Sequence, residues 1–283
     1  MTVGRFLLIL VALGLGLIGW AYWTAIADPV VREAEVALAG WPEGAPPVRA
    51  VLISDLHVAG PDMPPSRLAR IVARINDLRP DIVLIAGDFV SDKRTSTRFY
   101  PLREAVAPLA ALRPRFGTIA VLGNHDHWRN EAEARAALTA IGIRVVNNDV
   151  VTAGPLAVGG LDDAFTGHED LAATLARLRA LPGARILLSH SPDPFPDVPG
   201  DVGLMLAGHT HCGQVRLPLI GAVSTMSDYG DRYACGLIRE GGKILIVSAG
   251  LGTSILPLRL GAVPDLWLVR LGPRPVAAPS SRR

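Results

Sequence analysis

Residues 49–57 read RAVLISDLH, a short apolar run that ends in serine, aspartate and histidine. Such a run followed at once by polar residues is typical of a buried strand that ends in a polar loop. The same arrangement recurs in IVLIAGD at 82–88 and TIAVLGNHD at 118–126. Apolar residues at helical spacing predict helices between and after these runs, at 66–78, 102–112 and about 130–141. Strands that alternate with helices predict an α/β layered domain.

The second half of the chain continues this pattern and then becomes richer in strands. Further strands are predicted at 156–158, 186–188 and 204–207, and an amphipathic helix is predicted at 170–181. After residue 215 only strands are expected, at 235–238, 244–247 and 266–269, with a hairpin turn at 240–243. We therefore predict one α/β (α+β layered) domain with mixed sheets at 49–271.

The composition limits the classes of protein to which this chain can belong. It has 283 residues, of which 49% are hydrophobic and 19% charged, which is enough for a sizeable core and excludes a disordered chain. The net charge is +2 and there is no basic run, so nucleic acid is not expected as a ligand. No feature of the sequence indicates an obligate protein partner.

The N-terminal segment is long and apolar enough to cross a membrane. Residues 6–27 carry no charge over 22 positions, and about 20 apolar residues span a bilayer. Aromatic residues at 20, 22 and 23 stand where an interfacial belt would lie. We predict a single-pass anchor at 1–27, with the rest of the chain on the extracytoplasmic side because Arg5 precedes the apolar run. A cleaved signal peptide is the alternative, because Ala25-Ile26-Ala27 resembles a cleavage site, and would give an exported soluble form.

Three other segments carry weaker signals. Residues 28–48 contain four prolines and are predicted to be a connector, and residues 272–283 are predicted to be a disordered tail. Cys212 and Cys235 are too few for a disulfide framework. We expect two unrelated thiols, with a single bridge in an oxidising compartment as the alternative.

Polar residues of a few types gather where the predicted strands end. They include five of the seven histidines in the chain. The full set is Asp55, His57, Asp88, Asn124, His125, Asp126, His190, His209 and His211. Taken singly, each is an ordinary turn residue. Five successive strand ends with such residues predict one shared site, because α/β sheets bind ligands beyond the carboxyl ends of their strands.

The residue types in this set indicate a metal site. Imidazole suits Zn, Fe and Mn, whereas carboxylate and amide oxygens suit Mn and Mg. The set lacks the group of thiolates typical of a structural zinc site. Two ions that share a carboxylate can bind both the attacking and the leaving oxygen of a phosphoryl displacement.

The series Asp-x-His, Gly-Asp, Gly-Asn-His-Asp, His and Gly-His-x-His resembles the calcineurin-like metallophosphoesterases in order and spacing. The resemblance runs from about residue 49 to residue 271. The segments GLDD at 160–163 and GLGTS at 250–254 look like the bacterial membrane-associated branch of that family. The resemblance implies two mixed β-sheets in a sandwich flanked by helices. It also implies that phosphodiester or pyrophosphate bonds are hydrolysed with a metal-bound hydroxide.

The resemblance also assigns roles to individual residues. One ion would be held by Asp55, His57, Asp88 and His211, and the other by Asp88, Asn124, His190 and His209, with Asp88 as the bridge. His125 would protonate the leaving alkoxide, and Asp126 would orient that imidazole. We expect two divalent ions, manganese first, with iron, zinc or magnesium as alternatives.

Attachment to a membrane predicts a lipid-linked or cell-envelope substrate, such as a nucleotide-linked lipid. A catalytically silent metal-binding scaffold on the same fold is the alternative function. His127 and Trp128 are candidates for the wall of a substrate cleft, with ordinary loop residues as the alternative. Arg259 is a candidate ligand for a phosphate or a carboxylate.

Overall fold

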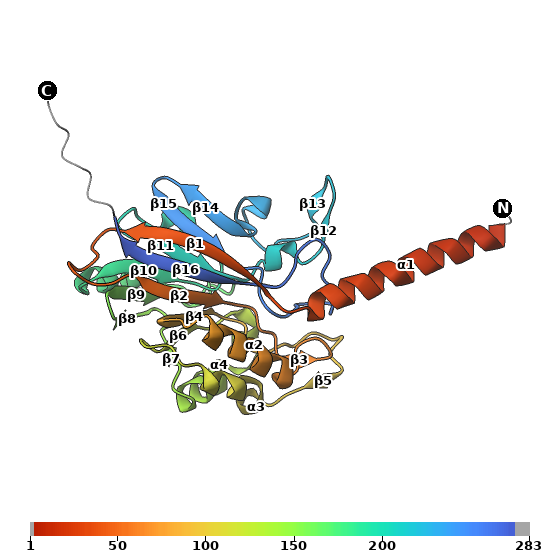
Figure 1. Ribbon diagram of the computed structural model, residues 1–283, viewed down its shortest axis with the longest axis horizontal. Coiled ribbons are helices and arrows are strands. Elements are labelled where there is room, and N and C mark those ends of the chain that lie inside the picture. Colours follow the sequence, from red (N-terminus) through yellow and green to blue (C-terminus); the bar gives the residue numbers. More distant parts are fainter. Residues whose placement is uncertain (1–2, 275–283) are drawn as a thin grey trace, which may run out of the picture.

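Two six-stranded β-sheets face each other in the computed structural model of the protein, which describes residues 3–274 (Figure 1). The first sheet contains, in spatial order, β1 (Val30–Leu38), β16 (Asp265–Pro273), β2 (Val48–Ile53), β4 (Ile82–Ala86), β6 (Thr118–Val121) and β7 (Arg144–Val145). The second contains β14 (Gly236–Glu240), β15 (Lys243–Val247), β11 (Leu204–Ala207), β10 (Ala184–Leu188), β9 (Leu156–Gly160) and β8 (Asp149–Ala153). Both sheets combine parallel and antiparallel pairs, which confirms the predicted fold class.

Helices cover the outer faces of the sandwich. They are α2 (Pro65–Asp77), α3 (Leu102–Val106), η1 (Ala107–Ala111), α4 (Asn124–Ala140), α5 (Leu171–Ala180), η2 (Phe195–Asp197) and η4 (Gly230–Tyr233). The short helix η3 (His211–Gly213) follows β11 and contains the predicted ligand His211. Two small antiparallel sheets complete the domain. One pairs β3 (Ala59–Gly60) with β5 (Arg98–Phe99), and the other is the hairpin of β12 (Arg216–Leu217) and β13 (Gly221–Ala222).

The core has three apolar layers, because each sheet buries both of its faces. The middle layer lies between the sheets and includes Leu52, Leu84, Ile186 and Leu206. Residues of α2, α3 and α4 pack on the outer face of the first sheet, and α5 packs on the outer face of the second. Strands buried on both faces read as continuous apolar runs, which is why runs such as 82–86 were recognisable in the sequence.

Some predicted elements differ from those observed. Part of the predicted connector, Val30–Leu38, is the edge strand β1, which pairs in parallel with β16. The helix predicted at 102–112 changes to a 3₁₀ helix after Val106. The helix expected from about 130 begins earlier, at Asn124, and is interrupted at Asn130, whose side chain accepts a hydrogen bond from Glu133 N at 3.1 Å. Residues 275–283 of the predicted tail lie outside the described residues.

An apolar helix, α1 (Val3–Ile26), leads away from the domain (Figure 1). Only 6% of its most apolar 18-residue window is buried, so it is not a core helix. Its C-terminal end nevertheless packs on the domain, because Ala21 and Ala25 are buried and Arg67 Nη2 donates to Ala27 O at 2.7 Å.

Candidate metal centre

The predicted ligands lie at the carboxyl ends of five strands, three in the first sheet and two in the second. Asp55 and His57 follow β2, Asp88 follows β4, Asn124 follows β6, His190 follows β10, and His209 and His211 follow β11. Neighbouring parallel strands bring their carboxyl ends to one edge of a sheet. The two sheets present these ends to each other, so the site lies between them.

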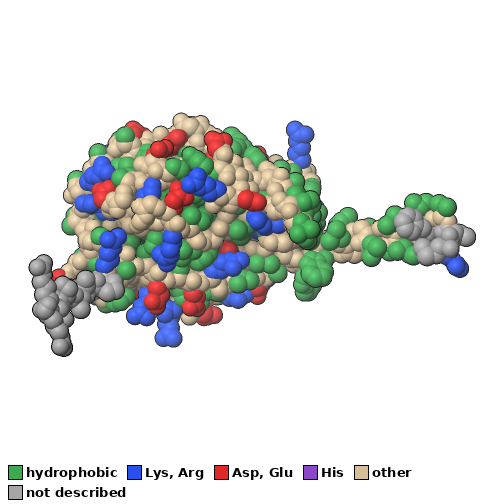
Figure 2. Space-filling view, turned by 90° about the horizontal axis from the view of Figure 1, so that it is seen from above, with side chains coloured by type: hydrophobic (Ala, Val, Ile, Leu, Met, Phe, Trp, Pro, Cys, Tyr) green, Lys and Arg blue, Asp and Glu red, His purple; other side chains and the backbone are tan. Residues whose placement is uncertain are grey.

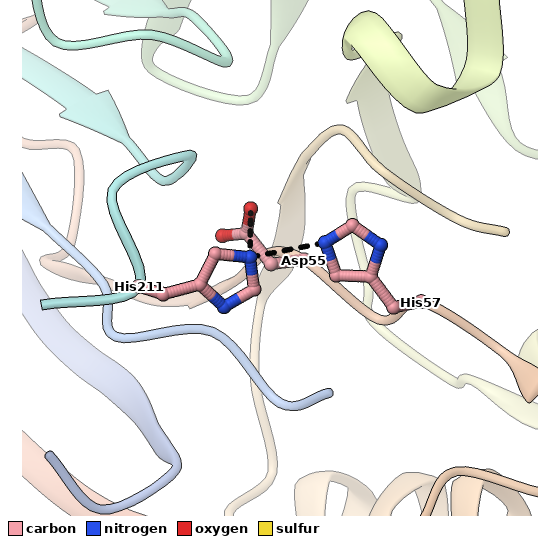
Figure 3. Close-up of side chains that lie close together, drawn as sticks. All are labelled: Asp55, His57 and His211. Atoms are coloured by element: carbon pink, nitrogen blue, oxygen red, sulfur yellow. Dashed lines mark hydrogen bonds and ion pairs between the residues drawn. The ribbon is translucent and has the colours of Figure 1, made fainter. Parts of the chain in front are cut away.

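One group of donors surrounds His57. Its Nε2 lies 3.0 Å from His211 Nε2 and 3.4 Å from Asp88 Oδ2. His211 Nε2 in turn lies 3.5 Å from Asp55 Oδ1. Figure 3 shows the two contacts of His211 Nε2 as dashed lines, one to the carboxylate of Asp55 and one to the imidazole of His57. These are the four residues that the family resemblance assigns to one ion.

The second group surrounds His190. Its Nε2 lies 3.0 Å from Asn124 Oδ1, 3.1 Å from His209 Nδ1 and 3.2 Å from Asp88 Oδ2. Asp88 Oδ2 is therefore close to both groups. These four residues match the set that the resemblance assigns to the other ion, with Asp88 as the shared ligand.

The separations within both groups fit metal coordination. Ligand atoms about 2.1 Å from an ion lie roughly 3.0 Å apart in an octahedron and roughly 3.4 Å apart in a tetrahedron. The observed separations, from 3.0 to 3.5 Å, cover this range. The nitrogen, carboxylate and amide donors thus fit two divalent ions.

Two histidines are fixed with one ring nitrogen toward the centre. His190 Nδ1 lies 2.7 Å from Ala86 O, and His209 Nε2 lies 3.0 Å from Met226 O. A carbonyl oxygen can only accept, so these nitrogens carry the proton and the other nitrogen of each ring presents its lone pair to the centre. This arrangement is typical of metal-ligating histidines.

Backbone strain is concentrated at the same residues. Five of the seven predicted ligands have φ between 44° and 69°, the left-handed region: Asp55, His57, Asp88, His209 and His211. Residues other than glycine seldom adopt it, and such strain clusters at functional sites. Gly208 allows the β11 loop to approach β2, because a Cβ there would lie 2.5 Å from Asp55 Oδ2.

Burial favours the uncharged form of three of the donors. It raises the pKa of the Asp55 carboxyl to about 6, because the charged form loses its hydration. It lowers the pKa of His209 to about 3 and the pKa of His57 well below the usual value, so these imidazoles are neutral, the form that binds metal. A bound cation would favour the ionised carboxylate and the neutral imidazoles alike.

The sequence analysis did not identify Asp92, which contacts His125. His125 Nδ1 lies 2.5 Å from Asp92 Oδ1. The carboxylate of Asp126 instead accepts hydrogen bonds from the backbone N–H groups of Asp88, Phe89 and Gly123. The residue placed against His125 is therefore Asp92 and not Asp126, and Asp126 fixes the loop that carries Asp88. An acidic residue four positions after Asp88 was the only signal available in the sequence.

His125 could by distance also be a ligand, because it groups with His57 and Asp88 within 4.8 Å. Its contact with Asp92 favours the role of proton donor. It also lines a cavity of about 400 Å³ that opens beside the centre, together with Trp128. His127 does not line this cavity, and its Nε2 lies 2.7 Å from Asp162 Oδ1. A larger, more polar cavity of about 900 Å³ adjoins the smaller cavity at Ser224 and Met226 and includes none of the predicted ligands.

Two other expectations were wrong. Arg259 is fully buried and donates to Ala249 O at 2.7 Å and Gly252 O at 2.6 Å, so its guanidinium stabilises a loop and is not available to a phosphate. Cys212 and Cys235 form a disulfide bond and are not unrelated thiols. The bond joins the loop after His211 to the start of β14.

A family model described as calcineurin-like phosphoesterase matches residues 48–213, which carry all seven predicted ligands. The chain belongs to this family. Calcineurin-like phosphoesterases depend on a dinuclear metal centre, and the chain has Asp and His groups that could hold metal ions. The chain is accordingly a metal-dependent hydrolase of phosphoric esters.

Relatives within the family agree with this assignment. The chain is 33% identical over 240 residues to the uncharacterized metallophosphoesterase YkuE of Bacillus subtilis, covering 81% of each protein. It is 31% identical to the phosphodiesterase YaeI of Escherichia coli, covering 83% of this chain and 86% of that protein. A transmembrane protein with metallophosphoesterase domain from Danio rerio is 30% identical, and the match covers 86% of this chain but only 57% of that longer relative.

Proposed function

We propose that this chain is a two-metal phosphodiesterase or pyrophosphatase. The observation that supports it most strongly is the pair of four-donor groups that share Asp88 Oδ2. When bound, two ions at such a site neutralise charge on the phosphoryl oxygens and lower the pKa of a bound water.

The protein's own side chains would perform the remaining steps. Water attacks phosphorus and loses a proton to the solvent, and the bond from phosphorus to the leaving oxygen breaks. His125, held at Nδ1 by Asp92, would give its Nε2 proton to that oxygen. Asp126 keeps the Asp88 loop in place through three backbone hydrogen bonds. Manganese is the ion that we expect first.

Hydrolysis of p-nitrophenyl esters tests this function directly. The full-length chain in detergent, stripped of metal, is expected to hydrolyse bis(p-nitrophenyl) phosphate only after a divalent ion is added, and faster than p-nitrophenyl phosphate. Manganese, iron, zinc and magnesium are compared at equal occupancy. A folded, fully loaded protein without turnover on either ester would instead support a metal-binding scaffold.

The substrate that we propose is a lipid-linked or cell-envelope phosphoester, such as a nucleotide-linked lipid. The cavity beside the centre supports this choice. Its walls include Val215, Val223, Met226, Ile255 and Leu256, which suit an apolar chain more than a second charged group.

We further propose that the chain is held in the cell membrane by α1, with the domain on the extracytoplasmic side. The disulfide bond supports export, because such bonds persist in oxidising compartments and are rare in the cytosol. Retention of α1 is supported by its contact with the domain. Ala25, within the candidate cleavage site, is helical and fully buried, so a peptidase would have poor access.

The mature chain is therefore expected to keep its N-terminal segment. Its intact mass should include residues 1–27, and the protein should stay in the membrane fraction after an alkaline carbonate wash. Both cysteines should resist alkylation in intact cells until a reductant is added. A mature protein that begins at Asp28 would contradict the membrane anchor. Cysteines that are alkylated without a reductant would contradict export of the domain.

A further inference from the structure

Large apolar side chains are exposed on two loops near the place where α1 leaves the domain. The first loop is the β12–β13 hairpin, whose tip carries Leu219, 108% exposed, and Ile220, 70% exposed. The second, at 254–258, carries Ile255, 71% exposed. Figure 1 places β12 and β13 at the end of the domain that carries α1, and Figure 2 shows hydrophobic side chains gathered at that end. Apolar groups exposed together in this way mark an interaction surface.

The two loops form one surface because Gln214 connects them. Its side chain accepts a hydrogen bond from Ser254 N at 2.8 Å and donates one to Leu256 O at 3.0 Å. Its backbone carbonyl accepts from Leu260 N at 3.0 Å. We call the hairpin 215–223 and the segment 254–258 together the apolar loops.

A backbone contact sets the position of the apolar loops along α1. Arg259 N donates to Ala21 O at 2.9 Å, next to the segment that carries Ile255. Ala21 precedes the end of α1 at Ile26 by five residues, which at about 1.5 Å per residue is roughly 7–8 Å along the helix axis. The loop thus lies beside the last turns of α1 and not beyond its end.

The aromatic residues of α1 lie at the same level. Trp20 and Trp23 flank Ala21 in the sequence and are 70% and 73% exposed. Tryptophan in a membrane helix prefers the headgroup region. If α1 spans a bilayer with these rings in that region, the 254–258 segment lies at the same depth, and its exposed isoleucine meets lipid and not water.

The cavity of the metal centre ends at the same surface. One side of it is formed by Asp88, Asn124, His125 and other polar residues of the centre. The lining also includes residues of the apolar loops, among them Val223 and Ile255. A phosphoester bound at the centre could therefore extend an apolar chain along this wall toward the bilayer.

From these contacts we propose that the apolar loops insert into the leaflet that faces the domain, in the same bilayer that α1 spans. The cavity then opens on the membrane surface and takes an amphiphilic phosphoester directly from it. The substrate part of this inference rests on the proposed phosphodiesterase function. The insertion itself depends only on the contacts between α1 and the loops.

A fluorescent label tests the insertion without any use of activity. Leu219→Cys in the full-length chain provides a free thiol for an environment-sensitive dye, because Cys212 and Cys235 are joined. Glu43→Cys, in the turn between β1 and β2, is the matched control on an exposed loop away from α1 (Figure 1). The protein is placed in vesicles of phosphatidylethanolamine and phosphatidylglycerol that contain a nitroxide-labelled lipid.

The dye at position 219 is expected to shift to shorter wavelength and to be quenched by the nitroxide lipid, whereas the dye at position 43 remains in water. Equal exposure of both dyes to water would overturn the proposal. A protein partner or a second copy of the chain would then be the occupant of the apolar loops.

A pair of substrates with one leaving group tests the route of the lipid. The double variant Leu219→Asp and Ile220→Asp changes the hairpin tip and leaves the cavity lining intact. Turnover of phosphatidyl-p-nitrophenol in vesicles is expected to fall at least about tenfold, because each buried Leu or Ile side chain changes partitioning by about that factor. Turnover of soluble bis(p-nitrophenyl) phosphate should stay within about twofold, since no group at the centre changes.

Equal losses on both substrates, or no loss on the lipid, would overturn the proposal. If the wild type hydrolyses neither substrate, the result counts against the phosphodiesterase function. The fluorescent label at position 219 would still test the insertion.

Discussion

Replacing Asp88 by asparagine is expected to abolish binding of both metal ions and to reduce turnover of bis(p-nitrophenyl) phosphate by about 10³-fold or more. Asp88 Oδ2 lies 3.4 Å from His57 Nε2 and 3.2 Å from His190 Nε2, so the change weakens both groups of donors at once. Loss of a single hydrogen-bond donor to a transition state already costs about 10²–10³-fold. Metal content per chain and the rate at saturating metal are the two measurements.

The amide has nearly the same shape as the carboxylate, so the fold should survive, and near-ultraviolet circular dichroism checks this. Asp201→Asn is the matched control, because it makes the same chemical change at an ion pair with Arg179 far from the centre. It should retain two ions and full turnover. An Asp88→Asn protein that keeps both ions and its activity would rule out Asp88 as the shared ligand.

Replacing His125 by alanine is expected to reduce turnover while the protein keeps both metal ions. General acid catalysis contributes about 10²–10⁴-fold, so the loss should approach this range for a basic leaving group. Diphenyl phosphate releases a more basic phenolate than bis(p-nitrophenyl) phosphate does, and should therefore suffer the larger loss. The ratio of the two losses, with metal content per chain, separates a proton donor from a ligand.

Asp92→Asn is a companion variant, because it removes the carboxylate from His125 Nδ1 without changing the predicted ligands. The turnover of Asp92→Asn should lie between that of the wild type and that of His125→Ala. The loss should show the same dependence on the leaving group as the loss in His125→Ala. His168→Ala, an exposed histidine, is the control and should behave as wild type. Loss of one ion from His125→Ala would identify His125 as a ligand. An equal loss of rate on both esters, with both ions retained, would rule out His125 as the acid.

The apolar strands and the polar residues that follow them could be read from the sequence for a physical reason. Strands buried on both faces, such as 82–86, leave an apolar run that does not depend on its neighbours. Edge strands do not have this property. β1 reads VVREAEVAL with alternating polar residues, and it becomes a strand only because β16 offers it an open edge.

Side-chain partners were harder to predict than the ligands themselves. The order of the motifs placed Asp55, Asp88 and His190 correctly at one site, because parallel strands end at the same edge. The partner of His125 could not be predicted in this way. Whether Asp92 or the adjacent Asp126 reaches the imidazole depends on how the loop after β4 turns, and that turn is set by Asp126 itself.

By itself, the sequence determined the fold class, the residues gathered at the strand ends and an apolar segment long enough for a membrane, because each depends on local pattern. The tertiary structure decided the pairing of Cys212 with Cys235, the burial of Arg259 and the position of the apolar loops beside α1. These features depend on loops far apart in the chain whose meeting is fixed by the packing of two sheets, and no local pattern encodes that packing.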